Sequence, residues 1–159
     1  MGIFDKLKQA KNYLSGGGVK VDLILDESAI PGEGKLHIKV LALVEEYEIL
    51  ADKLYINVVA EETIKYRENY SGHSHHSHHS HRGATNRTKT VKTFKEQIII
   101  DEDFRLDPYG EYEWEAIFNI PDGYEGTYRG INAFHEWKVL AGISKKGNDP
   151  DSGWKPFVV

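Results

Sequence analysis

Six of the eight histidines of this 159-residue chain fall within nine consecutive positions. The tract repeats His-Ser-His three times between residues 73 and 81. Neutral imidazole is a good ligand for divalent transition metals, and histidine-rich tracts bind such ions through changing subsets of rings. The spacing therefore indicates a set of candidate ligands for Zn²⁺ or Ni²⁺ that consists of His73, His75, His76, His78, His79 and His81.

The histidine tract lies in a predicted hairpin loop that spans residues 71–83. Polar segments flank it at residues 66–70 and 82–90, and β-rich runs lie beyond both. Loop tips tolerate low-complexity insertions of this kind. Three interpretations stay open: a solvated loop without a specific ligand, a metal site, and an assembly or pH-sensing element, because imidazoles titrate near pH ~6.5. No cofactor is expected to be required elsewhere in the chain.

The carboxylates and hydroxyls of the chain do not form a known catalytic motif. There is no cysteine, no HExxH or GxSxG motif and no phosphate-binding P-loop. Hydrolytic acid–base catalysis needs two carboxylates that converge across a cleft in different environments. The carboxylate clusters here are instead sequence neighbours at predicted turns or strand ends: Asp26/Glu27, Glu45/Glu46, Glu61/Glu62, Asp101/Glu102/Asp103 and Asp149/Asp151. We therefore do not expect an enzyme.

Two histidines lie outside the tract, and neither pattern predicts a catalyst. His135 is in phase with Trp137 and Val139 on the apolar side of a strand, which is typical of a buried histidine with satisfied hydrogen bonds. His37 is in phase with Lys35 and Lys39, so we expect it at the surface.

Composition narrows the class of protein further. The formal net charge is −5 and 40% of the residues are hydrophobic, which is enough for a packed core in a single domain. The acidic balance argues against a general nucleic-acid binder. The apolar runs are far shorter than the ~18 residues that cross a bilayer, and the first residues lack a secretory signal. We expect a cytoplasmic protein.

Hydrophobic periodicity divides the chain into three parts. Residues 1–15 form a predicted amphipathic helix whose apolar stripe contains Ile3, Leu7, Ala10 and Leu14, and residues 16–18 form a glycine linker. The helix is expected to dock on the chain's own sheet, with a partner or a peripheral membrane contact as the alternatives.

Residues 19–159 form the third part, in which the period changes from 3.6 to 2. The predicted strands span residues 19–26, 36–42, 54–60, 91–100, 111–120 and 131–143. Residues 30–34 form a predicted turn with Gly32 at positive φ, and residues 103–110 form a predicted loop. The tail 155–159 is either a last edge strand or an exposed apolar arm. Strands with one polar face each and short turns between them predict an all-β protein, an immunoglobulin-like antiparallel β-sandwich.

Several segments of this pattern resemble the N-terminal half of the arrestin-like fold. They are VKVDLIL from residue 19, IPGE from residue 30, DPYGEYEWEAIFNIP from residue 107, FHEWKVLAGI from residue 134 and GNDPDSGW from residue 147. Together they are most similar to the bacterial sporulation-control proteins, over residues 13–155. Two departures are Tyr109, which separates Pro108 from Gly110, and the apolar run 41–43 at a place where paired glycines are expected.

The resemblance implies a domain that binds and scaffolds rather than one that catalyses. The leading hypothesis is a noncatalytic arrestin-like adaptor that recruits protein partners through sheet edges and loops. The alternatives are a self-assembling structural protein, which would be a homo-oligomer, and a metal-binding module that uses the histidine tract.

Overall fold

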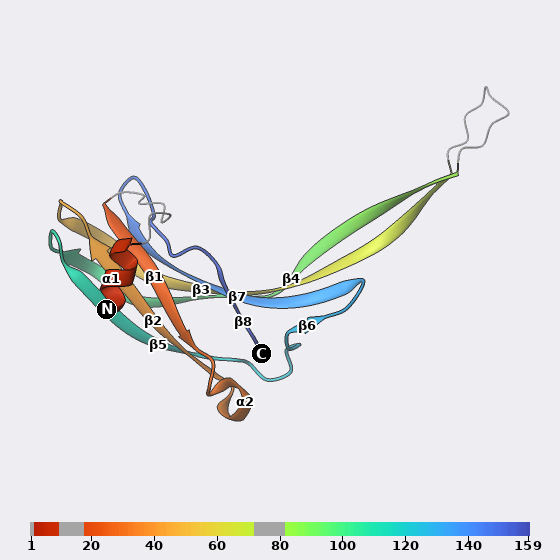
Figure 1. The fold of residues 1–159 in the computed structure, drawn as a ribbon, viewed down its shortest axis with the longest axis horizontal. Coiled ribbons are helices and arrows are strands. Elements are labelled where there is room, and N and C mark those ends of the chain that lie inside the picture. Colours follow the sequence, from red (N-terminus) through yellow and green to blue (C-terminus); the bar gives the residue numbers. More distant parts are fainter. Residues whose placement is uncertain (1, 10–17, 72–81) are drawn as a thin grey trace, which may run out of the picture.

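The structure is a computed structural model that describes residues 2–9, 18–71 and 82–159. Two antiparallel sheets pack against each other (Figure 1). The first has the order β1-β2-β5, with β1 at Val19–Asp26, β2 at Lys35–Val44 and β5 at Glu111–Asn119. The second has the order β4-β3-β7-β6, with β3 at Ile49–Ser71, β4 at Arg82–Leu106, β7 at Ala133–Lys145 and β6 at Tyr128–Arg129. The predicted all-β antiparallel sandwich is confirmed.

The core lies between the sheets and follows the alternation seen in the sequence. On β2, Leu36, Ile38 and Val40 are buried, while His37 between them is exposed. Trp137 of β7 lies at the centre, with its ring near those of Phe94 and Phe118. Both sheets therefore contribute alternate side chains to one interior, as the period-2 pattern requires.

Two strands are much longer than the apolar alternation predicted. β3 contains 23 residues and β4 contains 25, against the predicted spans 54–60 and 91–100. β4 also runs through the first part of the predicted loop 103–110. The prediction was short because residues 61–71 and 82–93 are mostly polar, and their strand pairing is not accompanied by apolar alternation. At the other end of the sheet, β7 begins at Ala133 rather than at residue 131, and Ile131 is 93% exposed.

The turn after β1 differs from the prediction. A short helix, α2, spans Ile30–Glu33, and Gly34 ends it in the left-handed region at φ 63°. Gly32 does not have a positive φ, so the assignment of the left-handed position to Gly32 was wrong. The glycine that follows the last helical residue takes it instead, as is common at helix ends.

The N-terminal helix α1 is described from Ile3 to Gln9 and packs on the outer face of the first sheet. Leu7 is buried against Leu41 and Leu43 of β2, with Phe4 beside them, whereas Ile3 is 44% exposed. The packed face is therefore that of Phe4 and Leu7, and the predicted position of Ile3 in the apolar stripe is wrong. Residues 10 and 14 of that stripe lie outside the described residues. The cover provided by α1 accounts for the apolar run 41–43, whose outward side chains would otherwise face water.

The C-terminal tail forms an edge strand, which is the first of the two predicted alternatives. β8 (Lys155–Phe157) pairs with β7, and Phe157 is buried against Trp137. Lys155 ties the two sheets together, because its Nζ lies 2.6 Å from Asp22 Oδ1 and 2.6 Å from the carbonyl oxygen of Leu23.

Candidate functional site

The most prominent feature outside the sandwich is the β3–β4 hairpin (Figure 1). β7 pairs with β3 only as far as Ala133 opposite Ile64. The Lys65 amide still donates to the carbonyl oxygen of Asn132 at 2.7 Å, and from Tyr66 to Ser71 β3 pairs with β4 alone, in continuous register up to Ser71 opposite Arg82. The two strands therefore leave the sandwich as a two-stranded ribbon that other described elements do not cover.

A buried histidine holds the base of this hairpin. The register between β3 and β4 shifts between Ala60 and Glu61, which leaves Thr93 as the extra residue of a bulge. The Thr93 hydroxyl lies 2.7 Å from Nε2 of His135, and the other ring nitrogen, Nδ1, lies 2.9 Å from the carbonyl oxygen of Gly126. Because a carbonyl can only accept, Nδ1 carries a proton, and in the neutral ring Nε2 then accepts from the threonine hydroxyl. His135 is 2% exposed, as its phase with Trp137 predicted.

Two further contacts fasten the hairpin where it leaves the sandwich. The Tyr128 hydroxyl donates a hydrogen bond to Glu62, and this bond raises the pKa of Tyr128. Nζ of Lys138 lies 2.6 Å from Glu61 Oε2, and both side chains are largely covered. The bulge bends and twists the strand at this point, so these contacts set the direction in which the hairpin projects.

The outer edge of β4 faces no strand among the described residues, since β4 is the first strand of its sheet. Charge is divided along this edge. The half nearer the hairpin tip carries the exposed basic residues Arg87, Lys89, Lys92 and Lys95, and the half beside the sandwich carries the acidic residues Glu96, Asp101, Glu102 and Asp103 together with one basic residue, Arg105, which pairs with Glu48. Of the basic four, only Arg87 forms an ion pair within the described part of the chain, and its partner is Glu68.

The two faces of the hairpin differ in chemistry. One continues the core face of the sheet and exposes Ile64, Tyr66 and Val91. On the opposite face Thr63 and Thr90 are hydrogen bonded at 3.0 Å. Strand alternation places Lys65, Arg67, Asn86 and Thr88 on this second face as well, beside a shallow hollow of about 420 Å³ whose lining also includes Tyr66, Arg87 and Asn132. Amide, hydroxyl and cationic groups make this second face polar and basic.

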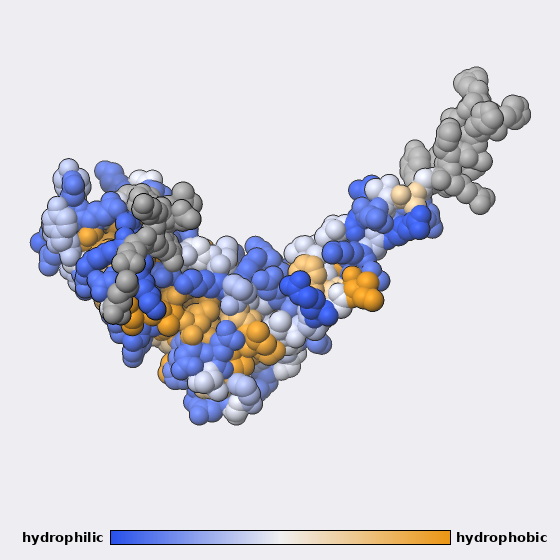
Figure 2. All heavy atoms as spheres, viewed as in Figure 1, coloured by the Kyte–Doolittle hydropathy of each residue, from blue (hydrophilic) through white to orange (hydrophobic). Residues whose placement is uncertain are grey.

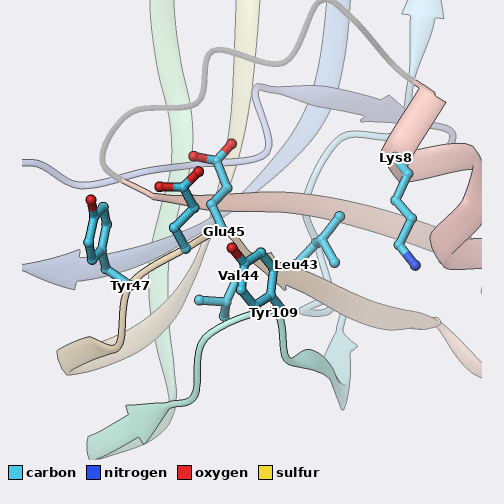
Figure 3. Close-up of a pocket in the computed structure, with 7 residues that line it drawn as sticks. Lys8, Leu43, Val44, Glu45, Tyr47 and Tyr109 are labelled. Atoms are coloured by element: carbon cyan, nitrogen blue, oxygen red, sulfur yellow. The ribbon is translucent and has the colours of Figure 1, made fainter.

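A second hollow, of about 560 Å³, lies between α1 and the loops at the opposite end of the molecule (Figure 3). Figure 3 shows its lining, which consists of Lys8, Leu43, Val44, Glu45, Glu46, Tyr47 and Tyr109. Tyr109, the residue that interrupts the Pro-Gly pair, takes a positive φ of 59° and is 71% exposed. Lys8 forms an ion pair with Glu111 at 2.6 Å, and this bond raises the pKa of Lys8. Glu45, which is half-buried, and Glu46, which is exposed, are sequence neighbours on the same side of this hollow rather than carboxylates converging from opposite walls.

A third hollow, of about 690 Å³, lies on the outer face of the first sheet, on the part that α1 leaves open. Ile24, Ile117 and His37 are exposed there, and His37 is a surface residue as predicted. The Nζ of Lys39 lies 2.9 Å from Glu113 and 3.7 Å from Glu115, so the charged groups beside the hollow pair with one another.

The metal ligands predicted from sequence, His73, His75, His76, His78, His79 and His81, lie outside the described residues. In the described residues no cluster of three or more histidines, cysteines or acidic residues is placed to hold a metal ion. The two carboxylates between residues 147 and 153 are used locally: Asp151 accepts a hydrogen bond from the Gly153 amide at 2.8 Å, and Asp149 accepts one from the Lys145 amide at 3.3 Å. Among the described helices, none has the length and apolar character that a bilayer crossing demands.

Sequence reasoning missed the charged edge of β4. The signal available was the threonine-rich, lysine-rich segment 85–95, whose threonines favour strands, followed by the acidic group at residues 101–103. Edge position could not be read from that segment, because it depends on which strands pair.

Comparison with known proteins identifies the fold. No protein-family model matches this chain, and no curated protein matches it by sequence. Among solved structures, it is similar to Spo0M, a sporulation control protein from Bacillus subtilis, with 17% sequence identity and a TM-score of 0.55. The match covers 91% of this chain and 50% of Spo0M, so the chain spans half the length of that protein. The chain therefore has the arrestin-like fold of the Spo0M type.

Proposed function

We propose that this domain is a noncatalytic arrestin-like scaffold that joins a second polypeptide through the exposed edge of β4. The observation that carries the proposal is a 25-residue strand whose outer edge has no strand partner in the described structure. An edge of this kind offers a row of backbone donors and acceptors to an extended segment, which then adds to the sheet as a further strand.

The side chains of β4 restrict which segment could bind. Lysines on an edge strand prevent indiscriminate pairing, because an apolar strand cannot satisfy their charges. Lys89, Lys92 and Lys95 are exposed and form no ion pair in the described part of the chain. A partner strand with acidic residues opposite them gains favourable cross-strand pairs, whereas a basic one is repelled.

The base of the hairpin supports binding through preorganisation. The bonds from His135 to Thr93 and from Tyr128 to Glu62 hold the ribbon in one direction before any partner arrives. Binding to a strand that is already extended and anchored costs less conformational entropy than ordering a flexible loop.

The test uses the full chain immobilised as bait in extract of its native cells. Three baits are compared: the natural chain, the charge reversal Lys89→Glu/Lys92→Glu, and the matched reversal Lys146→Glu at an exposed site outside β4, just after the end of β7. We expect a protein that the natural and Lys146→Glu baits retain and that the β4 variant loses. When purified, this protein should protect β4 amides from hydrogen exchange. Equal capture by all three baits, or protection confined to other strands, would contradict the proposal.

A further inference from the structure

We propose that the polar, basic face of the β3–β4 hairpin binds double-stranded DNA by lying in its major groove. This is the face on which Thr63 and Thr90 are hydrogen bonded. The inference goes beyond the proposed function, because it uses a face of the ribbon and not the edge of β4. Three properties of the hairpin point to this partner: its charge, its distance from the acidic sandwich, and the width and side chains of the ribbon.

Positive charge is concentrated in this hairpin, although the chain as a whole is acidic. Residues 65–95 contain seven lysines and arginines and one acidic residue, Glu68, whereas the whole chain has a formal net charge of −5. The acidic balance of the whole chain therefore does not describe the hairpin. A local basic field attracts a polyanion even where the net charge of the protein is negative.

Several of these cations are not neutralised by the chain itself. Arg87 is paired with the single carboxylate of the segment. Lys65 and Arg67 of β3 are exposed, and neither forms an ion pair within residues 2–9, 18–71 and 82–159. The same holds for Lys89 and Lys92 of β4. Exposed cations of this kind bind DNA by neutralising its phosphates and releasing their counterions.

The ribbon also holds positive charge away from the acidic part of the molecule (Figure 1). From Tyr66 outward β3 pairs with β4 alone, so residues 66–71 extend beyond the other strands of the sheet. At a rise of about 3.3 Å per residue, this part is about 20 Å long. The Debye length is about 8 Å at physiological ionic strength, so the acidic residues of the sandwich are largely screened from a ligand bound there.

The width and the side chains of the ribbon fit the major groove of B-form DNA. Paired strands lie about 4.8 Å apart, and the groove is about 12 Å wide and admits a two-stranded β-ribbon. The cross-strand pairs Lys65–Thr88 and Arg67–Asn86 lie on the polar face, and Asn69 follows on the same face of β3. Arginine and asparagine match the hydrogen-bonding groups of base edges in this groove, and lysine neutralises phosphate.

An anionic membrane is the competing polyanion, and the apolar residues of the hairpin disfavour it. A segment that binds a bilayer surface buries apolar side chains in it while its cations meet the headgroups. Here the exposed Ile64 and Val91 lie at the base of the ribbon, on the face opposite Lys65 and Arg67. One planar surface therefore cannot meet both groups.

The test measures binding of the purified full chain to a fluorescein-labelled DNA duplex of about 20 base pairs, by fluorescence anisotropy at pH 8 with EDTA. Under these conditions the imidazoles of the histidine tract are neutral and free of metal. Three or four phosphate contacts should make the dissociation constant rise about fifty- to hundredfold between 50 and 200 mM salt. A duplex RNA of the same length should bind at least about tenfold more weakly, because its major groove is too narrow for a ribbon.

Two variants with the same change in net charge locate the binding face. Lys65→Glu/Arg67→Glu reverses two cations of the polar face on β3, so it should weaken DNA binding at least about tenfold and reduce the salt dependence. Lys6→Glu/Lys146→Glu, at exposed sites on α1 and just after β7, should change the dissociation constant less than about threefold, since these charges are screened from the hairpin. Circular dichroism of each variant checks that it is folded.

Three results would overturn the inference: no binding to duplex DNA at 50 mM salt, equal losses in the two variants, or duplex RNA bound as tightly as DNA. Vesicles of phosphatidylglycerol form the last arm of the experiment. Vesicle binding that needs Lys65 and Arg67, without binding to DNA, would make the hairpin a membrane surface and would also overturn it. Each of these results leaves the proposed use of the β4 edge standing, because neither substituted β3 residue belongs to that edge.

Discussion

The two halves of the β3–β4 ladder share a backbone arrangement and differ in what covers them. In the inner half Leu54, Ile56, Val58 and Ala60 are fully buried beneath the first sheet. In the outer half the equivalent face exposes Ile64 and Tyr66. Figure 2 shows the same division, with apolar surface gathered at the sandwich and mostly polar surface along the hairpin. Strand pairing continues through both halves, so pairing by itself does not create a core.

This difference in burial separates the part of the ladder that stabilises the fold from the part that is exposed to solvent. An isolated two-stranded ribbon is marginal in water, so the outer half depends on contacts at its base. The inner half gains its stability from apolar burial, and its core-facing side chains are closed to solvent. The exposed edge of β4 in the outer half therefore contributes little to folding.

We expect the largest difference in the free energy of unfolding when one aromatic side chain is removed from the core and, separately, one from the hairpin. Trp137→Ala in the core should lower the free energy of unfolding by ~3–5 kcal/mol, because a large cavity remains. Tyr66→Ala on the hairpin should lower it by less than ~1 kcal/mol, since an exposed side chain leaves no cavity. Urea unfolding measures both. Similar losses would mean that the outer half belongs to the core.

The junction between the halves should give an intermediate effect. His135→Leu removes the partner of the Thr93 hydroxyl and of the Gly126 carbonyl, at an expected cost of ~1–3 kcal/mol. Hydrogen exchange should become faster in residues 83–93 before it does so in residues 94–106. Thr93→Ser, which keeps the hydroxyl, is the matched control. Uniform acceleration over both halves would contradict the role of His135 as the anchor of the hairpin.

Removing the outer half should have a small effect on folding. Joining Ile64 to Lys89 through an Asn-Gly turn deletes the ribbon where β7 ceases to pair with β3. The sandwich should unfold cooperatively, with a free energy of unfolding within ~1 kcal/mol of the natural value. Chemical denaturation measures this. Loss of the cooperative transition would show that the hairpin supports the core.

The histidine tract should affect metal binding and leave stability unchanged. Zinc titration calorimetry on the full chain should detect binding at pH 8 that fades between about pH 6.5 and pH 5.5, because protons compete for imidazole nitrogens. Replacing all six tract histidines with serine should abolish binding and change the free energy of unfolding by less than ~0.5 kcal/mol. Identical calorimetric curves for the two proteins would remove the tract as a metal site.

The smallest effect concerns the hydroxyl of Tyr128 at alkaline pH. Its hydrogen bond to Glu62 holds the pKa above the ordinary value of about 10 in the folded chain. Ionisation therefore favours the unfolded chain. The stabilisation that this hydrogen bond gives the folded chain is complete below pH ~10, and it is lost as the pH rises through the pKa of Tyr128 in the folded chain. Tyr128→Phe should lack this alkaline decline when urea unfolding is compared at pH 8 and pH 11. The same decline in both proteins would contradict the assignment.

Much of the inner half could be predicted, and little of the outer half. The alternation from Glu111 to Asn119 placed β5 correctly, and the phase of His135 with Trp137 placed that histidine in the core. Residues 61–71 and 82–93 were missed because they combine strand-favouring threonines with charges on both faces. Periodicity detects a strand only where a second layer makes its two faces unequal.

The amino-acid sequence by itself determined the alternation of apolar and polar side chains, and with it the sandwich and the residues that face its interior. Those properties depend on neighbours two positions apart. Only the tertiary structure decided that β4 is an edge strand, that its basic and acidic halves line one open edge, and that Thr93 meets His135 across 42 positions of the chain. Each of these depends on which distant segments pair, and that choice is made by the burial of the whole core rather than by any local pattern.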